Sequence, residues 1–534
     1  MEEKIREHEK AAVERNKAFV EPERAAVQLK RSRNALLNIS KLPPEVLGNI
    51  FQCNVTPRHD FDWLEEGSHN FLFVCHHWHE VALCTPGVWS FWGNTLVDWA
   101  RWHRYSGTAP LDLILGHAYG DDDGGRPFDI ALHDALQEHA TRDTIRRIHL
   151  SSNGASLLRS IISSLTTVCE EVRSNSVESL ILLNGAREPV DVSDFFIHHR
   201  FPRLQHLALR RCSIASWNLL ISRTADLTTL VLHFHNSPPA PTISQLFHIL
   251  TSNPTLMKLS LSQFTIPNDG GGKFPLRVPL RHLKELELAG GLQHVFGLLS
   301  QLDHPGKMNR LEITLFNCAV TDIPHTIGPY LRDHFRHRGR SRNWLGLGVT
   351  QLERHVTLSA GDMCGTGLPF PMTYPNQFLN LHMQLGRPGG LLEKGLLDLV
   401  AHTPLEDIVR FESSCGFATV ENICAQFPNL RALRLGLLMI PLPTMSPEST
   451  MDGDEEVLPS LQHIEFRGRP YRDDWSPLMA FLTRRASSGD RLRSLTISES
   501  HVCPEVRERI RSIVQGFCHI RPMGQCSFGT CSEQ

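Results

Sequence analysis

The first residues that could do chemistry are a group of cysteine and histidine side chains. Cys75 and His79 stand four residues apart, which would place both on one face of a helix, and His76 and His77 lie beside them. A structural zinc ion needs four such ligands, and no second pair with a zinc-like spacing is present. We therefore interpret Cys75 as a packed helix residue and the histidines as solvent-facing, and we expect no metal site.

Other catalytic patterns are incomplete. The run from Gly270 to Lys273 has the glycines of a phosphate-binding loop, but Phe274 stands where such a loop needs Ser or Thr. The chain contains no G-x-S-x-G elbow and no H-E-x-x-H helix. The acidic runs 121–123 and 452–456 lack the spacing of a calcium loop. We assign no residue to catalysis, and we expect a non-catalytic protein without a cofactor.

The composition narrows the class of protein. A length of 534 residues exceeds one compact core, so several domains or an extended repeat array are expected. The net charge of −3 gives no basic excess for nucleic acid, and no apolar run is long enough to cross a bilayer. The 13 cysteines form no C-x-x-C pair, and the first residues are charged. We therefore expect an intracellular protein, cytoplasmic or nuclear, that binds neither nucleic acid nor membrane.

Residues 1–37 are charged, and we interpret them as a solvated helix, with a coiled coil as the alternative. Two helices with apolar faces are expected after this segment. Pro43 and Pro44 favour a helix start, where a missing N–H is harmless. The next apolar residues share one helix face: Val46, Leu47, Ile50 and Phe51. A second helix is expected over residues 71–82, where apolar residues keep the spacing i, i+4, i+7 at Val74, Trp78 and Val81.

The order of these residues resembles the F-box, especially the F-box-like proteins of fungi. The resemblance depends on six features in a fixed order. They are Leu42-Pro43, an acidic residue, two aliphatic residues, Ile50-Phe51, a V-C-x-x-W motif from Val74 to Trp78, and a late Trp89. The stretch between Phe51 and Val74 is longer than the usual family spacing. A run of the form S-G-T-A-P-L-D-L-I-L follows and also resembles these proteins. The resemblance is specific over residues 36–115.

Later in the chain the sequence returns repeatedly to strands of the form L-x-x-L-x-L. Within the two runs 204–283 and 430–492, their spacing ranges from 23 residues, between Leu204 and Leu227, to 31 residues, between Leu461 and Leu492. This spacing is typical of leucine-rich repeats. The strand patterns begin at Ile145, Leu204, Leu227, Leu256, Leu283, Leu430, Leu461 and Leu492. Helix-spaced apolar residues lie between strands, at 243–250 and 292–299. One strand and one helix cannot bury their own apolar face, so stacked units are expected.

The predicted fold is α/β: a small helical F-box-like domain followed by a leucine-rich repeat solenoid, with parallel strands on one face and helices on the other. The expected divisions are a charged segment 1–37, the F-box-like domain 38–92, a connection 93–140, the repeat array 141–500, and a C-terminal helix and tail 501–534. An early strand is expected at 110–115. The repeat frame is lost between about 316 and 404, where 355–358 and 378–383 are the expected strands.

The resemblance implies a function through partners. F-box proteins are substrate receptors of SCF-type ubiquitin ligases, in which the F-box binds a Skp-family adaptor and, through it, a cullin scaffold. The implied adaptor contacts are Leu42, Pro43, Val46, Leu47, Ile50, Phe51, Val74, Trp78 and Trp89. In the alternative, these residues only pack against residues 93–115 and the first repeat.

The repeats would hold an unknown protein substrate on the side of the strands opposite the leucines. The candidate substrate contacts there are His206, Arg210, Lys258, Glu285, Glu287, Arg434, His463 and Glu465. Their charges alternate in sign, so they indicate no single class of ligand. Two other hypotheses remain: a repeat scaffold whose divergent F-box recruits no ligase, and an enzyme built on the repeats, against which the missing catalytic residues count.

Overall fold

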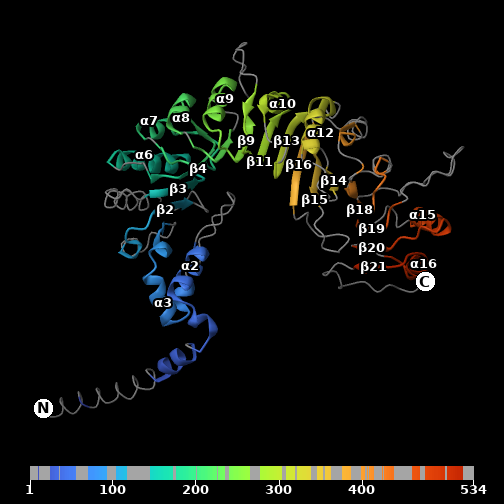
Figure 1. Ribbon diagram of the computed structural model, residues 1–534, viewed down its shortest axis with the longest axis horizontal. Coiled ribbons are helices and arrows are strands. Elements are labelled where there is room, and N and C mark those ends of the chain that lie inside the picture. Colours follow the sequence, from blue (N-terminus) through green and yellow to red (C-terminus); the bar gives the residue numbers. More distant parts are fainter. Residues whose placement is uncertain are drawn as a thin grey trace. The chain divides into compact units, whose positions relative to one another are not determined.

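The structure is a computed structural model, and it divides into two compact units, Met1–Ala225 and Asp226–Gln534. Each unit combines strands and helices (Figure 1). The structure describes residues 10, 25–34, 36–55, 70–92, 104–116, 145–171, 176–199, 201–224, 226–234, 240–264, 277–303, 308–318, 322–337, 345–352, 355–362, 376–385, 398–402, 406, 408–413, 424, 426–437, 460–468, 475–498 and 502–520.

Within the described residues, the first unit starts with a helical stretch over 25–34, inside the charged segment expected to be helical, and the rest of 1–24 apart from residue 10 lies outside the described residues. Short helices follow, and the unit continues into a parallel sheet. The helices are η1 (Asn38–Lys41), α2 (Pro44–Val55), η2 (Asn70–Phe73), α3 (His76–Leu83) and η3 (Pro86–Trp89). The sheet strands are β1 (Phe91–Trp92), β2 (Leu111–Gly116), β3 (Ile145–Ser152), β4 (Ser179–Asn184) and β6 (His206–Arg210), each parallel to the next. The later elements between and after them are α6 (Ala155–Glu171), β5 (Val190–Asp191), α7 (Ser193–His198), β7 (Cys212–Ser213) and α8 (Trp217–Arg223).

The second unit repeats the same alternation. Its first four sheet strands are β8 (Thr229–His233), β9 (Lys258–Phe264), β11 (Glu285–Gly291) and β13 (Arg310–Cys318). The other elements in this part are α9 (Ile243–Ser252), β10 (Val278–Pro279), α10 (Leu292–Gln301), β12 (Leu302–Asp303), α11 (Ile323–Thr326) and α12 (Gly328–His337). Figure 1 shows α9 and α10 on the same side of these strands. The C-terminal part consists of β17 (Ile408–Ser413), β18 (Ala432–Leu437), β19 (His463–Gly468), α15 (Ser476–Ser487), β20 (Ser494–Ser498), α16 (Pro504–Ile513) and β21 (Phe517–Ile520).

Aligned leucines hold neighbouring strands together. The parallel register places Leu230 beside Leu259, Leu259 beside Leu286, and Leu286 beside Leu311. Each of these side chains is fully buried. Burying one leucine stabilises the fold by about 1.5–3 kcal/mol, so a row of four is a major contribution. Local signals agree with this packing, because α9 starts with a capping box between Thr242 and Gln245.

Within the described residues, two antiparallel pairings interrupt the parallel order where the repeat pattern fades. β14 (Leu345–Leu352) and β15 (His355–Asp362) are antiparallel, and so are β15 and β16 (Asn376–Leu385). β16 lies parallel to β13, and β14 lies parallel to β17. The three strands β14, β15 and β16 therefore form an antiparallel group between the parallel strands β13 and β17. The strands expected at 355–358 and 378–383 are confirmed as parts of β15 and β16.

The α/β class and the strands expected from the leucine pattern are confirmed. The early strand at 110–115 is β2. The helix expected over 71–82 is wrong in its first half, because Cys75 has extended backbone and separates η2 from α3. Val74 consequently stands outside α3 and does not share a helix face with Trp78. The run 270–273 and the acidic runs 121–123 and 452–456 lie outside the described residues.

His149 provides a test of the sheet packing in the first unit. It lies on β3, where its register neighbours are Ile114 and Ile181. Burial lowers its pKa from 6.5 to about 4, and its buried Nε2 atom has no hydrogen-bond partner among the described residues. Between these two pKa values the unfolded chain binds more protons than the folded chain. The contribution of His149 to stability therefore falls as the pH drops from about 6.5 to 4.

We predict that His149→Leu reduces this acid sensitivity, by at most about 3 kcal/mol between pH 7 and pH 4. Urea unfolding of the wild type and the variant across that pH range measures the difference. His248→Leu, at an exposed position of α9, is the matched control and should follow the wild type. Parallel pH curves for the wild type and His149→Leu would show that His149 is not desolvated as described.

Candidate functional site

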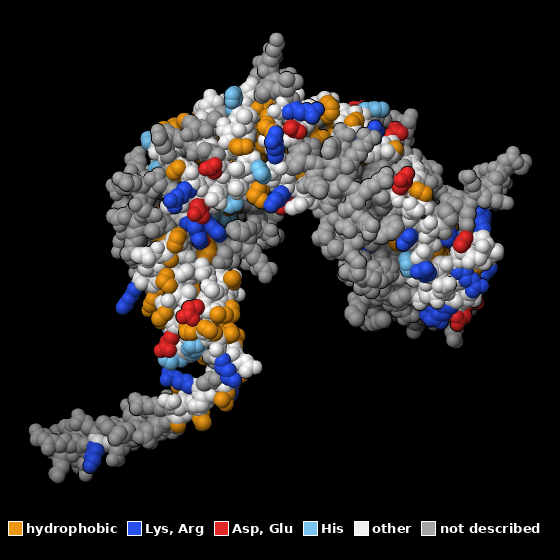
Figure 2. All heavy atoms as spheres, in the orientation of Figure 1, with side chains coloured by type: hydrophobic (Ala, Val, Ile, Leu, Met, Phe, Trp, Pro, Cys, Tyr) orange, Lys and Arg blue, Asp and Glu red, His pale blue; other side chains and the backbone are white. Residues whose placement is uncertain are grey.

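An exposed apolar surface covers the N-terminal helices. Within the described residues, the exposed large hydrophobic side chains lie between Val27 and Val74, with Ile197 as the exception. Val46 and Ile50 of α2 are 43% and 45% exposed, and Phe73 and Val74 are 86% and 53% exposed. Figure 2 shows hydrophobic side chains gathered over the part of the chain that holds α2 and α3. We call Ile39, Val46, Ile50, Phe73 and Val74 the N-terminal apolar surface.

A packed core lies beneath this surface. Leu47 and Phe51 lie next to Val46 and Ile50 on α2 and are 0% and 1% exposed. The Phe51 ring stacks on Phe71 with centroids 4.5 Å apart, and it contacts the half-buried Trp78 at 5.2 Å. The indole of the buried Trp89 donates a hydrogen bond of 2.7 Å to the carbonyl of Ala82. These aromatic contacts fix α2 against α3, and they leave the neighbouring Val46 and Ile50 side chains exposed to solvent.

Gly48 allows the close approach of α2 to the segment after α3. A Cβ atom at this position would lie 2.7 Å from Oγ1 of Thr85, closer than real Cβ contacts. The Thr85 hydroxyl is itself held by a hydrogen bond of 2.7 Å to the Val81 carbonyl. The small residue in α2 is therefore required by helix packing.

The adaptor contacts expected from the sequence fall into two groups. Pro43, Val46, Ile50 and Val74 are exposed, and Leu42 and Trp78 are half-buried. Leu47, Phe51 and Trp89 are core residues, so they can support a partner surface but cannot touch a partner in this fold. Ile39 and Phe73 are exposed members of the surface that the sequence reasoning missed. The break at Cys75 exposes Phe73, and no periodic pattern signals that break.

Asp112 joins the helical segment to the sheet, through its backbone on one side and its buried carboxylate on the other. Asp112 of β2 is fully buried, and its backbone N–H donates to the Ser90 carbonyl at 2.7 Å. The Arg146 guanidinium on β3 donates two hydrogen bonds to its carboxylate, at 3.0 and 2.7 Å. This contact raises the pKa of Arg146 above its ordinary value. Arg147 lies 3.9 Å from the same carboxylate.

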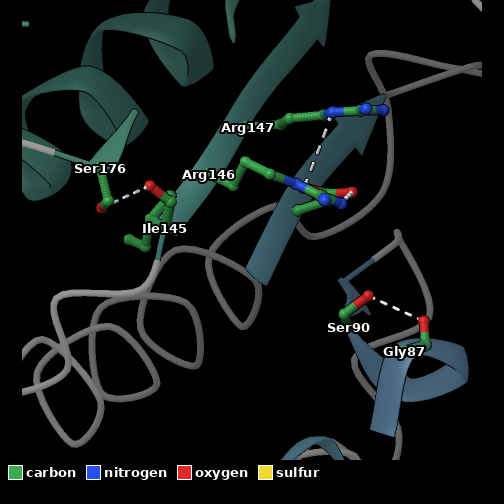
Figure 3. A network of polar contacts seen from close by, with 7 residues as sticks. Gly87, Ser90, Ile145, Arg146, Arg147 and Ser176 are labelled. Atoms are coloured by element: carbon green, nitrogen blue, oxygen red, sulfur yellow. Dashed lines mark hydrogen bonds and ion pairs between the residues drawn. The ribbon is translucent and has the colours of Figure 1, made fainter. Parts of the chain in front are cut away.

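Figure 3 shows Arg146 and Arg147 on β3, and Ser90 bonded through its hydroxyl to the Gly87 carbonyl. Gly87 belongs to η3, the last of the short helices. The chain of contacts therefore runs from η3 through Ser90 and Asp112 to β3. It fixes the N-terminal helices to the strands of the same unit.

Most of the expected substrate contacts pair with their neighbours across the strands. On β6 of the first unit, His206 is half-buried and Arg210 is exposed. In the second unit, Lys258 of β9 forms an ion pair of 3.2 Å with Glu285 of β11. Glu287 accepts a hydrogen bond of 3.0 Å from Ser260, whose hydroxyl also lies 3.3 Å from His233. This part of the sheet is polar and internally bonded.

Arg434 and Glu465 depart from the expectation of accessible substrate contacts. Both are buried, and the Arg434 guanidinium lies 2.8 Å from the Glu465 carboxylate and 3.1 Å from Glu412. The strand register explains this, because it places Glu412 beside Arg434 and Arg434 beside Glu465. His463 is half-buried, and its Nδ1 lies 2.7 Å from the Ser494 hydroxyl. Arg434 and Glu465 hold neighbouring strands in register and are not free to bind a partner.

No protein-family model matches this chain, and no curated protein matches it. Its function therefore has to be argued from the surfaces described above. Within the described residues no group of three or more His, Cys, Asp or Glu side chains could hold a metal ion. A helix long and apolar enough to cross a membrane is likewise absent from that part of the chain.

The Asp112 junction makes a specific prediction about stability. Asp112→Ala leaves the Arg146 guanidinium without its carboxylate and should destabilise the first unit by about 2–3 kcal/mol, since Arg146 is partly solvated. The midpoint of urea unfolding measures the change. Glu188→Ala removes an exposed partner of Arg159 and should shift stability by less than about 0.5 kcal/mol. Equal effects of the two substitutions would contradict a structural role for Asp112.

Proposed function

We propose that the chain is a substrate receptor of an SCF-type ubiquitin ligase, with its N-terminal helices binding a Skp-family adaptor. The observation that carries the proposal is the solvent-facing apolar side of α2. Val46 and Ile50 remain exposed although Leu47 and Phe51, on the same helix, are fully packed. The F-box resemblance of the sequence from Leu42 to Trp89 supports an adaptor as the partner of this side.

The concentration of exposed apolar side chains in the N-terminal helices also supports a protein partner. Apolar side chains gathered on one part of a surface mark interaction sites more often than isolated ones do. Phe73 is an aromatic residue on a short helix fixed by the packing of Phe71 beside it. Rigid aromatic and aliphatic residues of this kind dominate binding energy at protein interfaces. Burying Ile50 alone against a partner would contribute about 1.5–3 kcal/mol.

The strands would serve as the substrate-binding part. Their leucine spacing resembles that of leucine-rich repeats, and the parallel pairing of successive strands supports a solenoid. In this role the chain forms no covalent bond with its substrate. It brings a target lysine close to a ubiquitin-loaded enzyme and so raises its effective concentration.

A second candidate function is an interaction scaffold that recruits no ligase. The burial of Leu47, Phe51 and Trp89 favours it, because these implied contacts serve the core of the domain itself. The two functions differ in what covers Val46 and Ile50. A ligase receptor requires an adaptor on those side chains, and a scaffold does not.

Co-expression with a Skp-family adaptor from the same source tests the proposed function. The wild-type chain should co-purify with the adaptor, and Ile50→Asp should weaken binding by about 10- to 100-fold because it places a charge in an apolar interface. Isothermal titration with purified components measures the change. Ile50 is exposed, so the variant should unfold at the wild-type temperature.

Ile197→Asp provides the matched control, since Ile197 is 44% exposed and lies on α7, outside the N-terminal apolar surface. It should bind the adaptor as the wild type does. Leu47→Asp is unsuitable as a test, because a charge in the core would unfold the helices. Failure of the folded wild-type chain to bind an adaptor, or wild-type binding by Ile50→Asp, would contradict the ligase function and favour the scaffold.

A further inference from the structure

Four exposed arginines gather at one edge of the C-terminal part of the second unit. Arg484 lies in the last turn of α15 and Arg511 in the last turn of α16. Arg491 and Arg493 lie on the turn that leads into β20. All four are exposed, and we call them the C-terminal arginine cluster.

Backbone hydrogen bonds place these segments side by side. The N–H of Gln515, which follows α16, donates 3.1 Å to the carbonyl of Leu492, between Arg491 and Arg493. The N–H of Asp490 donates 3.0 Å to the carbonyl of Arg485, the neighbour of Arg484. Both helix ends therefore meet the turn that carries Arg491 and Arg493.

A buried arginine side chain fixes the turn before β20. Arg485 is buried, and its guanidinium donates to the carbonyls of Asp490 and Leu461, each at 3.1 Å. Arg485 therefore bonds to the backbone of the protein itself and fixes the turn. Its exposed neighbours are presented on an ordered backbone, which lowers the entropy lost when a ligand binds.

The charges of the cluster are only partly neutralised, since the turn carries the exposed carboxylate of Asp490 beside the two arginines Arg491 and Arg493. Arg511 lies 3.7 Å from Glu508, and both side chains are well exposed. Among the described residues, no ion pair involves Arg484, Arg491 or Arg493. The positive charge of Arg493 also contributes, after burial, to the lowered pKa of His463. Helix dipoles favour cations at Arg484 and Arg511, but they do not account for Arg491 and Arg493.

We infer that the C-terminal arginine cluster binds an acidic peptide segment of a partner protein. Guanidinium groups bind carboxylate and phosphate oxygens through paired, charge-assisted hydrogen bonds, and several of them on one ordered edge can pair with several acidic side chains. The C-terminal arginine cluster belongs to the second unit and the N-terminal apolar surface to the first, and the inference goes beyond the proposed function. Its test does not depend on adaptor binding.

Fluorescence anisotropy of the full chain with a labelled peptide of alternating Glu and Gly tests the inference. The wild type should bind this probe, with affinity falling as salt rises, and a Gln and Gly peptide should not bind. The same sequence with phosphoserine in place of Glu shows whether phosphate is preferred. Arg491→Glu with Arg493→Glu should weaken binding by at least about tenfold.

Arg281→Glu with Lys284→Glu is the matched control. Both residues are exposed and lie at the turn into β11 of the same unit, so the charge change is identical. This control should bind the probe as the wild type does. Arg491→Ala with Arg493→Ala, which adds no negative charge, provides a second test if the reversal variant does not fold.

Four results would overturn the inference. They are absence of wild-type binding at low salt, unchanged binding by both folded cluster variants, an equal loss in the control, and tighter binding of a single-stranded DNA of equal charge. The equal loss would indicate a general charge effect. The DNA result would assign the cluster to nucleic acid.

Discussion

The burial of aligned leucines between neighbouring parallel strands is the constraint on which both units depend. Leu180 lies beside Leu207 in the first unit, as Leu259 lies beside Leu286 in the second, and all four are fully buried. A single strand with its helix leaves such a row half-covered, so each strand needs its neighbour. The parallel pairing also fixes which side chains meet on the other side. The Glu412, Arg434 and Glu465 contacts follow directly from that register.

In α2, packed residues stabilise the domain, and exposed residues form the surface proposed to bind a partner. Leu47 and Phe51 fix the helix against η2 and α3, and this packing orients Val46 and Ile50 toward solvent. The Asp112 junction then ties these helices to the first strands of the sheet. A partner held on the apolar side would therefore be connected to the strands of this unit through ordered contacts.

The sequence predicted most of the strands that have strong periodicity. The leucine spacing located β9, β11 and β20, because inward leucines on a strand recur every second residue. β4 was missed although Val177, Leu180 and Leu182 fill the same pattern with a valine first. The β14–β16 trio interrupts the repeat with antiparallel pairs, and no leucine frame predicts that change.

The residues of the candidate sites are exposed or buried according to tertiary contacts, and sequence spacing does not predict those contacts. One helix face contained Val46, Leu47, Ile50 and Phe51, but only packing against Phe71 and Trp78 decides which of them face solvent. Burial of Arg434 follows from the register of three strands that are far apart in the chain. The C-terminal arginine cluster joins residues from Arg484 to Arg511, and backbone pairing alone brings them to one edge.

Hydrogen–deuterium exchange of the full chain with and without a Skp-family adaptor tests the central claim most directly. The claim predicts slower exchange over α2 and η2 when the adaptor is present, because their exposed apolar side chains would be covered. Exchange over β11 and β13, deep in the second unit, should not change. Unchanged exchange over α2 at saturating adaptor, or protection confined to the strands, would contradict the claim that the N-terminal apolar surface binds the adaptor.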